Sequence, residues 1–112
     1  MANFHIYKTA AFELEDIWLY SARTWGERQA DKYIAQIYDC LQELADKEKH
    51  WRKPPRELCV PADIDHGIFF YHHGRHYIFF REFQNSDIGV ISILHDAMNI
   101  PVRLAIDLEK IK

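Results

Sequence analysis

The sequence predicts an α+β fold. A short N-terminal strand and an antiparallel helical hairpin precede a three-stranded antiparallel meander sheet and a short C-terminal helix. Two patterns carry this prediction. In the first half of the chain apolar residues recur at helical spacing, which is typical of helices with one buried face. In the second half they form short runs separated by turn residues, which is typical of strands.

The size and composition indicate a single globular unit. With 112 residues, of which 48% are apolar and 28% charged, the chain can bury one core, and we expect one domain over residues 1–112. No apolar run approaches the ~20 residues of a membrane span, and the N-terminus lacks the pattern of a secretory signal. We therefore expect a cytoplasmic protein that makes no membrane contact. Cys40 and Cys59 lie outside any zinc-binding spacing, and we expect both to be reduced thiols.

The net charge of −3 argues against a protein whose affinity comes from neutralising many phosphates. We expect a protein partner and no direct sequence-specific binding of nucleic acid. The basic residues of the proline loop fit a solvated loop, because successive prolines exclude helix there. That loop comprises Arg52, Lys53, Pro54, Pro55 and Arg56.

The helical hairpin follows a strand predicted within residues 3–9. One helix should close near Gly26, with Glu13 and two further acidic residues near its start, where the helix dipole favours negative charge. A second helix should run from about Glu27 to Lys49, and the short connection makes the two antiparallel neighbours. We expect one sheet face to receive Ile17, Trp18, Ile34, Tyr38 and Leu41.

The meander is predicted from runs at residues 67–73, 75–83 and 87–95, and a tail helix from Pro101 onward, since proline suits a first helical turn. If His73 and Gly74 form the first turn, His72 pairs with Arg75 and Tyr71 with His76. His72 and His76 then face opposite sides of the sheet, with His73 at the tip. The three imidazoles cannot reach one ion, so we expect neither a metal nor a cofactor.

Three segments together resemble the ParE toxins of the RelE/ParE superfamily of bacterial toxin-antitoxin modules. They are "WGERQADKYIAQI" at the helix junction, "HGRHYIFFR" across the hairpin, and "VISILHDAMN" at the end of the last strand. Each segment alone is weakly specific, whereas their order and spacing over nearly the whole chain are more so. The family's fold, a leading strand, a helical hairpin and an antiparallel sheet, is similar to the one that periodicity predicts.

The resemblance implies a toxin that inhibits DNA gyrase by protein binding and is neutralised by a cognate antitoxin. The superfamily's other branch implies ribosome-dependent cleavage of messenger RNA, and a non-toxic degenerate member is a third alternative. The chain departs from its relatives at Phe69 and Ser92, where arginine is common, and at Phe80, where tyrosine is usual. The departures at Phe69 and Phe80 remove polar groups that RNA cleavage would use, whereas Ser92 cannot make the gyrase contact that an arginine there would make.

Three sets of site residues follow. For a gyrase-directed toxin we expect no catalytic residue; for a nuclease the candidates are Arg75, His76, Arg81 and His95. The residues themselves favour a structural role for both histidines, with His76 hydrogen-bonding the backbone and His95 hydrogen-bonding a loop. Because "GIFFY" is too apolar to face water on both sides, the antitoxin should cover part of this sheet and one flank of the hairpin, contacting Phe69, Tyr71, Tyr77 and Phe79. The target should contact the tail helix through Arg103, Leu104 and Lys110, although that helix could equally serve only to cap the core.

Overall fold

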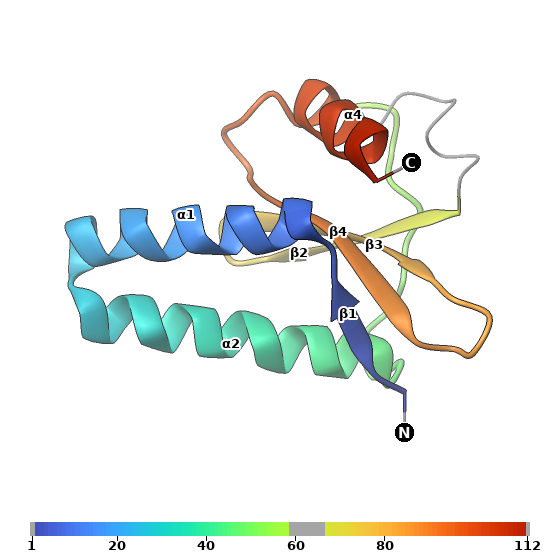
Figure 1. Cartoon of the computed structure of the whole chain (residues 1–112), viewed down its shortest axis with the longest axis horizontal. Helices are drawn as coiled ribbons and strands as arrows, with labels where there is room; N and C mark the ends of the chain where they lie inside the picture. The colour runs from blue at the N-terminus through green and yellow to red at the C-terminus, as the bar shows by residue number, and fades with distance from the viewer. Residues whose placement is uncertain (1, 59–66, 112) are drawn as a thin grey trace.

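A computed structural model describes residues 2–58 and 67–111, and its elements follow the predicted order (Figure 1). The predicted α+β fold is confirmed. Cys40 is a buried free thiol, whereas Cys59 lies outside the described residues. The elements are β1 (Phe4–Ile6), α1 (Lys8–Trp25), α2 (Glu27–Ala45), β2 (Ile68–His73), β3 (His76–Glu82), β4 (Ile88–His95) and α4 (Ile100–Lys110).

The four strands form one mixed sheet in the order β1-β4-β3-β2. The pairs β2–β3 and β3–β4 are antiparallel and make the expected meander, while β1 lies parallel to β4, with Phe4 opposite Ile88 and Ile6 opposite Val90. Because β1 has only three residues, it pairs with the first part of β4, and on that side the later part of β4 has no neighbouring strand.

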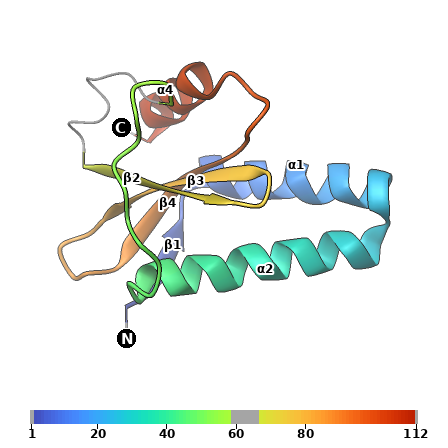
Figure 2. The same ribbon diagram turned by 180° about the vertical axis from the view of Figure 1, so that it is seen from behind.

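Helices cover both faces of the sheet. The α1–α2 hairpin lies on one face and projects beyond it, whereas α4 lies on the other (Figures 1 and 2). The central strand β4 is consequently buried on both sides, which explains why it reads as a nearly continuous apolar run. A register shift between Phe79 and Phe80 places Ile91 as an extra residue in β4, so Ile91 and Leu94 face α4 while Val90 and Ile93 face the hairpin.

The turn between β2 and β3 lies one residue later than we predicted. His73 pairs with His76, His72 with Tyr77, and Gly74 with Arg75 forms the turn. Gly74 has a φ of +57°, which side chains with a Cβ rarely adopt, and a Cβ there would lie 2.8 Å from the Tyr33 hydroxyl. The predicted partners were therefore wrong, but the predicted faces were right, because moving the turn by one residue shifts each partner by two positions.

The second helix ends at Ala45 instead of Lys49. Lys47 has a φ of +60°, which breaks the helix, and the Trp51 indole donates a hydrogen bond to the Leu44 carbonyl at 2.8 Å. The first helix begins at Lys8, so Glu13 stands in its second turn and not among the first residues that the dipole stabilises. Both errors concern helix ends, where the backbone conformation of one residue decides the boundary.

The predicted core set was only partly right. Ile17 and Leu41 are buried and Ile34 is half-buried, but Tyr38 is 42% exposed and Trp18 lies at the side of the hairpin, where its indole donates to Asp31 at 2.8 Å. The buried face of α2 differs from the predicted one. It comprises Ala30, Ile37, Cys40, Leu41, Leu44 and Ala45.

Candidate functional site

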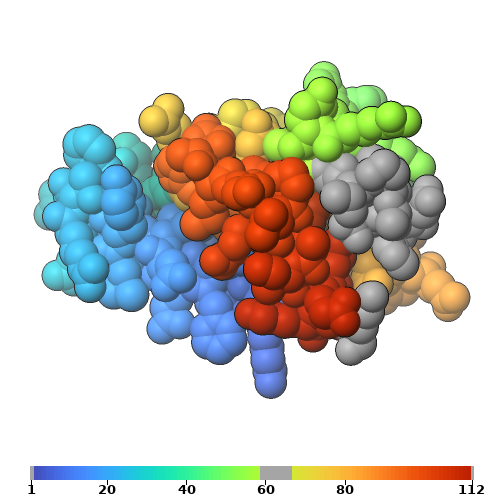
Figure 3. Space-filling view, turned by 90° about the horizontal axis from the view of Figure 1, so that it is seen from above, coloured from blue at the N-terminus to red at the C-terminus, as the bar shows by residue number. Residues whose placement is uncertain are grey.

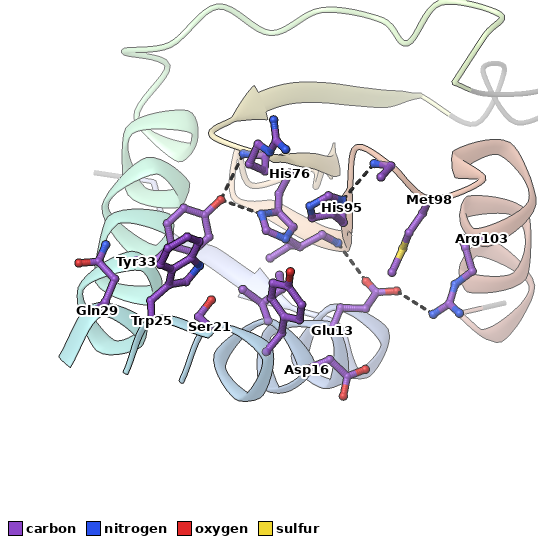
Figure 4. Close-up of a pocket in the computed structure, with 15 residues that line it drawn as sticks. Glu13, Asp16, Ser21, Trp25, Gln29, Tyr33, His76, His95, Met98 and Arg103 are labelled. Atoms are coloured by element: carbon purple, nitrogen blue, oxygen red, sulfur yellow. Dashed lines mark hydrogen bonds and ion pairs between the residues drawn. The ribbon is translucent and has the colours of Figure 1, made fainter. Parts of the chain in front are cut away.

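A groove of about 830 Å³ lies beside the later part of β4 (Figure 4). The helix α1 forms one wall, the end of the helical hairpin a second, and the segment that leads into α4 a third. The β2–β3 turn closes the groove at the end of the sheet. Most of the surface of the groove is apolar, and the most exposed of its large apolar side chains are Tyr20 at 64%, Trp25 at 71% and Met98 at 45%.

Beyond the last residue of β1, side chains of α1 form hydrogen bonds with backbone groups at the edge of β4. The Thr9 hydroxyl donates to the Ile91 carbonyl at 2.6 Å, and the Ile93 amide donates to Oε1 of Glu13 at 2.9 Å. These two bonds satisfy backbone groups that a neighbouring strand would otherwise bond. This stretch of the edge therefore carries side-chain partners in place of a strand.

A Tyr33–His76 hydrogen bond lies at the end of the groove nearest the β2–β3 turn. The Tyr33 hydroxyl is 2.7 Å from Nδ1 of His76, and it accepts the Arg75 amide at 3.4 Å (Figure 4). The ring of His95 stands perpendicular to that of His76, with 5.3 Å between centroids. Burial, assisted by the positive charge of a protonated His95, lowers the pKa of His76 to about 4, so His76 is neutral at pH 7.

A second polar cluster lies at the opposite end, under Arg103. Glu13 and Asp107 are buried, and the Ser92 hydroxyl donates to Oδ2 of Asp107 at 2.6 Å. Burial, together with a hydrogen bond to Asp107, raises the pKa of Glu13 to about 9. The Arg103 guanidinium, 4.0 Å from Oε2 of Glu13, opposes that rise but is half-exposed.

Three of the four nuclease candidates line this groove. Arg75, His76 and His95 lie at its sheet end, whereas Arg81 lies at the other end of β3. The Arg81 guanidinium donates hydrogen bonds to the Tyr7 hydroxyl and stacks over the Tyr7 ring, outside the groove. The four residues therefore do not form one cluster.

The four aromatic residues expected to bind an antitoxin do not share a surface. Phe79 is fully buried between the sheet and α4, so its assignment as a contact residue was wrong. Phe69 and Tyr71 pack on the hairpin side of the sheet, and Tyr77 packs on the α4 side. These side chains lie on opposite faces of the sheet because successive residues of a strand point to opposite sides.

The tail helix offers a different contact set from the one we expected. Leu104 is fully buried and cannot contact a target, so that assignment was wrong, whereas Arg103 and Lys110 are exposed. The large exposed apolar side chains of α4 are Val102 at 52% and Ile106 at 44%. Figure 3 looks onto this side of the molecule, with α4 at the centre of the view.

Sequence reasoning missed Glu13 and Tyr33 as site residues. Glu13 stands three residues after Ala10 and four before Ile17, on the apolar stripe of α1. A carboxylate at such a position signals a buried, hydrogen-bonded acid. Tyr33 stands on the apolar stripe of α2, and its hydroxyl needs a partner where the ring is half-buried.

A model of the family described as "ParE toxin of type II toxin-antitoxin system, parDE" matches residues 5–100. The chain belongs to the ParE toxin family. "Toxin ParE1" from Caulobacter vibrioides is 27% identical over 104 residues, which cover 93% of this chain and 99% of that relative. A solved structure described as "Chromosomal ParDE TA system from P. aeruginosa" superposes with a TM-score of 0.64 and 18% identity, covering 85% of this chain and 96% of that one.

The ParE family match extends from β1 to the first residue of α4. It includes all the groove-lining residues named above except Arg103, while the exposed residues of α4 lie beyond it. Of the residues that we expected to differ from ParE-like sequences, Ser92 is fully buried and bonded to Asp107, and Phe80 packs edge-on against Trp51 with 5.2 Å between centroids. Within residues 2–58 and 67–111 no helix is long and apolar enough to cross a bilayer.

Proposed function

We propose that this ParE-family toxin arrests growth by binding DNA gyrase, and that a cognate antitoxin neutralises it by occupying the groove. Family membership over residues 5–100 is the observation that carries the proposal. The groove supports it, because exposed aromatic side chains around an apolar floor are typical of protein-binding surfaces.

The antitoxin segment that fits this groove is an amphipathic helix. Thr9 and Glu13 already bond the edge of β4 at Ile91 and Ile93, so a strand could not pair with these groups without breaking both hydrogen bonds. A helix needs no backbone partner and can place apolar side chains against Ile17 and Trp25. Acidic residues on its flanks would face Arg75 and Arg103 at the two ends of the groove.

This antitoxin assignment replaces the sheet surface that we expected from sequence. It predicts that binding protects amides of residues 13–29, whereas an antitoxin covering the β2–β3 surface of the sheet would protect amides of residues 67–83. Hydrogen exchange of the complex distinguishes the two surfaces. Trp25→Ala should weaken antitoxin binding by more than tenfold, because exposed aromatic anchors dominate such interfaces. Phe12→Ala is the matched control, since Phe12 is 67% exposed and is not among the groove-lining residues.

The gyrase-binding surface that we propose is the exposed side of α4. Arg103, Ile106 and Lys110 recur at helical spacing and combine cationic with apolar surface, with Val102 beside them. A deletion of residues 103–112 would remove this surface, but it would also uncover the apolar face of the sheet beneath α4, because Leu104 and Leu108 are buried there. Substitution of exposed residues is therefore the sharper test.

The deciding experiment measures growth arrest together with two purified assays. Wild type should arrest growth and inhibit gyrase supercoiling, leaving ribosome-bound messenger intact. The double variant Ile106→Asp, Lys110→Glu should lose both effects while remaining folded, and Glu15→Lys, on the exposed side of α1, should retain them. Arrest without any effect on supercoiling would refute the gyrase target. A folded protein that causes no arrest would indicate a non-toxic member.

Ribonuclease activity is the second candidate, because Arg75, His76 and His95 meet at one end of the groove. A neutral His76 could accept a proton, and Arg75 could bind a phosphate. Under the gyrase proposal, His76→Ala and His95→Ala should still arrest growth if they fold. Loss of arrest together with loss of site-selective messenger cleavage in His95→Ala would establish the nuclease.

A further inference from the structure

We propose that Glu13 and Asp107 share one proton, and that the hydrogen bond between their carboxyl groups fixes α4 in its place on the sheet. Glu13 is then a positioning residue for the helix that we assign to target binding. The inference depends on the proposed function only for that last role, since the position of α4 can be measured without a target.

The two carboxyl groups belong to a chain of hydrogen bonds that begins and ends on β4. The Ile93 amide donates to Oε1 of Glu13 at 2.9 Å, and the Ser92 hydroxyl donates to Oδ2 of Asp107 at 2.6 Å. The two buried carboxyl groups thus bond consecutive residues of β4, one from α1 and one from α4. With the proposed link between them, the chain runs from β4 to α1, from α1 to α4, and from α4 back to β4. Each link joins a different pair of elements.

A proton is required because two ionised carboxylates cannot bond each other. Glu13 is 7% exposed and Asp107 is 2% exposed, so water cannot screen the repulsion between them. Among the described residues, the charged groups that act on the Glu13 carboxyl are Asp107 and Arg103 of α4. The nearest guanidinium nitrogen of Arg103 is 4.0 Å from Oε2 of Glu13, which is too long for a hydrogen bond, and the Arg103 side chain is half-exposed. Arg103 is therefore a weak counter-charge for Glu13. Asp16, Arg75 and His95 line the same groove.

The Glu13–Asp107 pair supplies a directional interaction, which the apolar contacts of α4 lack. Ile100, Leu104 and Leu108 pack on the sheet, and apolar contact has no directional preference along a helix axis. A buried hydrogen bond loses most of its energy when the partners move apart, so it selects one rotation and one translation of the helix. The exposed face that carries Arg103 and Lys110 is thereby held in one orientation.

Carboxyl-carbon NMR of the wild-type protein tests the shared proton directly. Glu13 should be protonated at pH 7 and should release its proton only well above the ordinary range of glutamate. Asp107→Asn should lower the pKa of Glu13, because an amide donor at that position favours the ionised form. A Glu13 that titrates in the ordinary range in wild type would refute the proposal, and this measurement needs no variant.

Hydrogen exchange of residues 100–111 tests the role in holding α4. Opening of α4 would expose Glu13 and release its proton to water. The equilibrium constant for opening of α4 in wild type should therefore rise roughly tenfold per pH unit between pH 5 and 8. In Glu13→Gln the amide can donate to Asp107 and accept from Ile93, so the opening constant should not depend on pH. Glu15→Gln, an exposed acid of the same helix, should keep the wild-type slope.

Two results separate this inference from the gyrase proposal. A pH slope in wild type that disappears in Glu13→Gln supports the shared proton whether or not the toxin acts on gyrase. Equal slopes in wild type and Glu13→Gln would overturn the inference and leave the gyrase proposal untouched. If α4 is also the target-binding helix, Glu13→Gln should retain growth arrest and Glu13→Ala should weaken it.

Discussion

Replacing His76 by asparagine should remove a stability loss that the wild-type protein suffers in acid. In the native state the pKa of His76 is about 4, against an ordinary value of 6.5. Below pH 6.5 the unfolded chain binds a proton at this position that the native state does not bind. Protons therefore favour unfolding, and the contribution of neutral His76 to stability is lost as the pH falls from 6.5 to 4.

The magnitude follows from the two pKa values. With each pKa unit equivalent to about 1.4 kcal/mol, the full loss is roughly 3 kcal/mol, and about 2 kcal/mol of it should occur between pH 7 and 5. Asparagine suits the site because its Oδ1 takes the place of Nδ1, and it can accept a hydrogen bond from the Tyr33 hydroxyl 2.7 Å away in wild type. The variant should therefore fold and lack the titration.

Urea unfolding at pH 7 and 5 measures the difference. Wild type should lose about 2 kcal/mol more than His76→Asn on acidification, and His50→Asn, a change at an exposed histidine, should behave as wild type. Glu13 acts in the opposite sense, because its raised pKa lowers stability as the pH rises from 4.5 to 9. The comparison must therefore be between variant and wild type at each pH. Identical acid sensitivity in wild type and His76→Asn would refute the reasoning.

Three further changes test the core and the groove. Phe80→Ala should destabilise the fold by about 3 to 5 kcal/mol in urea unfolding, because its ring is fully buried against Trp51. Phe12→Ala should change stability by less than about 0.5 kcal/mol, and an equal loss in both variants would contradict the assigned core. Tyr33→Phe should cost about 1 to 2 kcal/mol, since Nδ1 of His76 loses its partner, and should raise the hydrogen-exchange rate of the Arg75 amide.

The order and type of the elements could be predicted because periodicity depends on burial, and burial is strong here. The apolar runs around Ile78 and Val90 have the patterns of buried sheet strands, and the buried residues of α2 recur at helical spacing. The parallel pairing of β1 with β4 could not be deduced. Nothing in a three-residue strand indicates which neighbour it joins, so the sequence left the mixed character of the sheet open.

The site was harder to predict, for two physical reasons. The faces of β2 and β3 followed from alternation, but the register depended on the backbone conformation of Gly74, and sequence does not reveal which residue adopts a positive φ. The groove arises between elements that are distant in sequence, so residues such as Glu13 and Met98 become neighbours of one cavity only in the folded chain. Phe79 and Leu104 were placed on surfaces because burial on both faces of β4 was not anticipated.

The shortness of β1 connects the groove to the position of α4. Had β1 continued beside β4, its backbone would occupy the edge at Ile91 and Ile93 that Thr9 and Glu13 now bond from α1. The later part of β4 would then lie behind the backbone of β1, and neither the groove nor the Glu13–Asp107 contact could form. The edge that β1 leaves uncovered is therefore common to the groove that we propose for a partner helix and to the buried acid pair that reaches α4. A change in the length of β1 should therefore alter antitoxin binding and α4 protection together, whereas a change at Trp25, at the far end of the groove, should alter antitoxin binding alone.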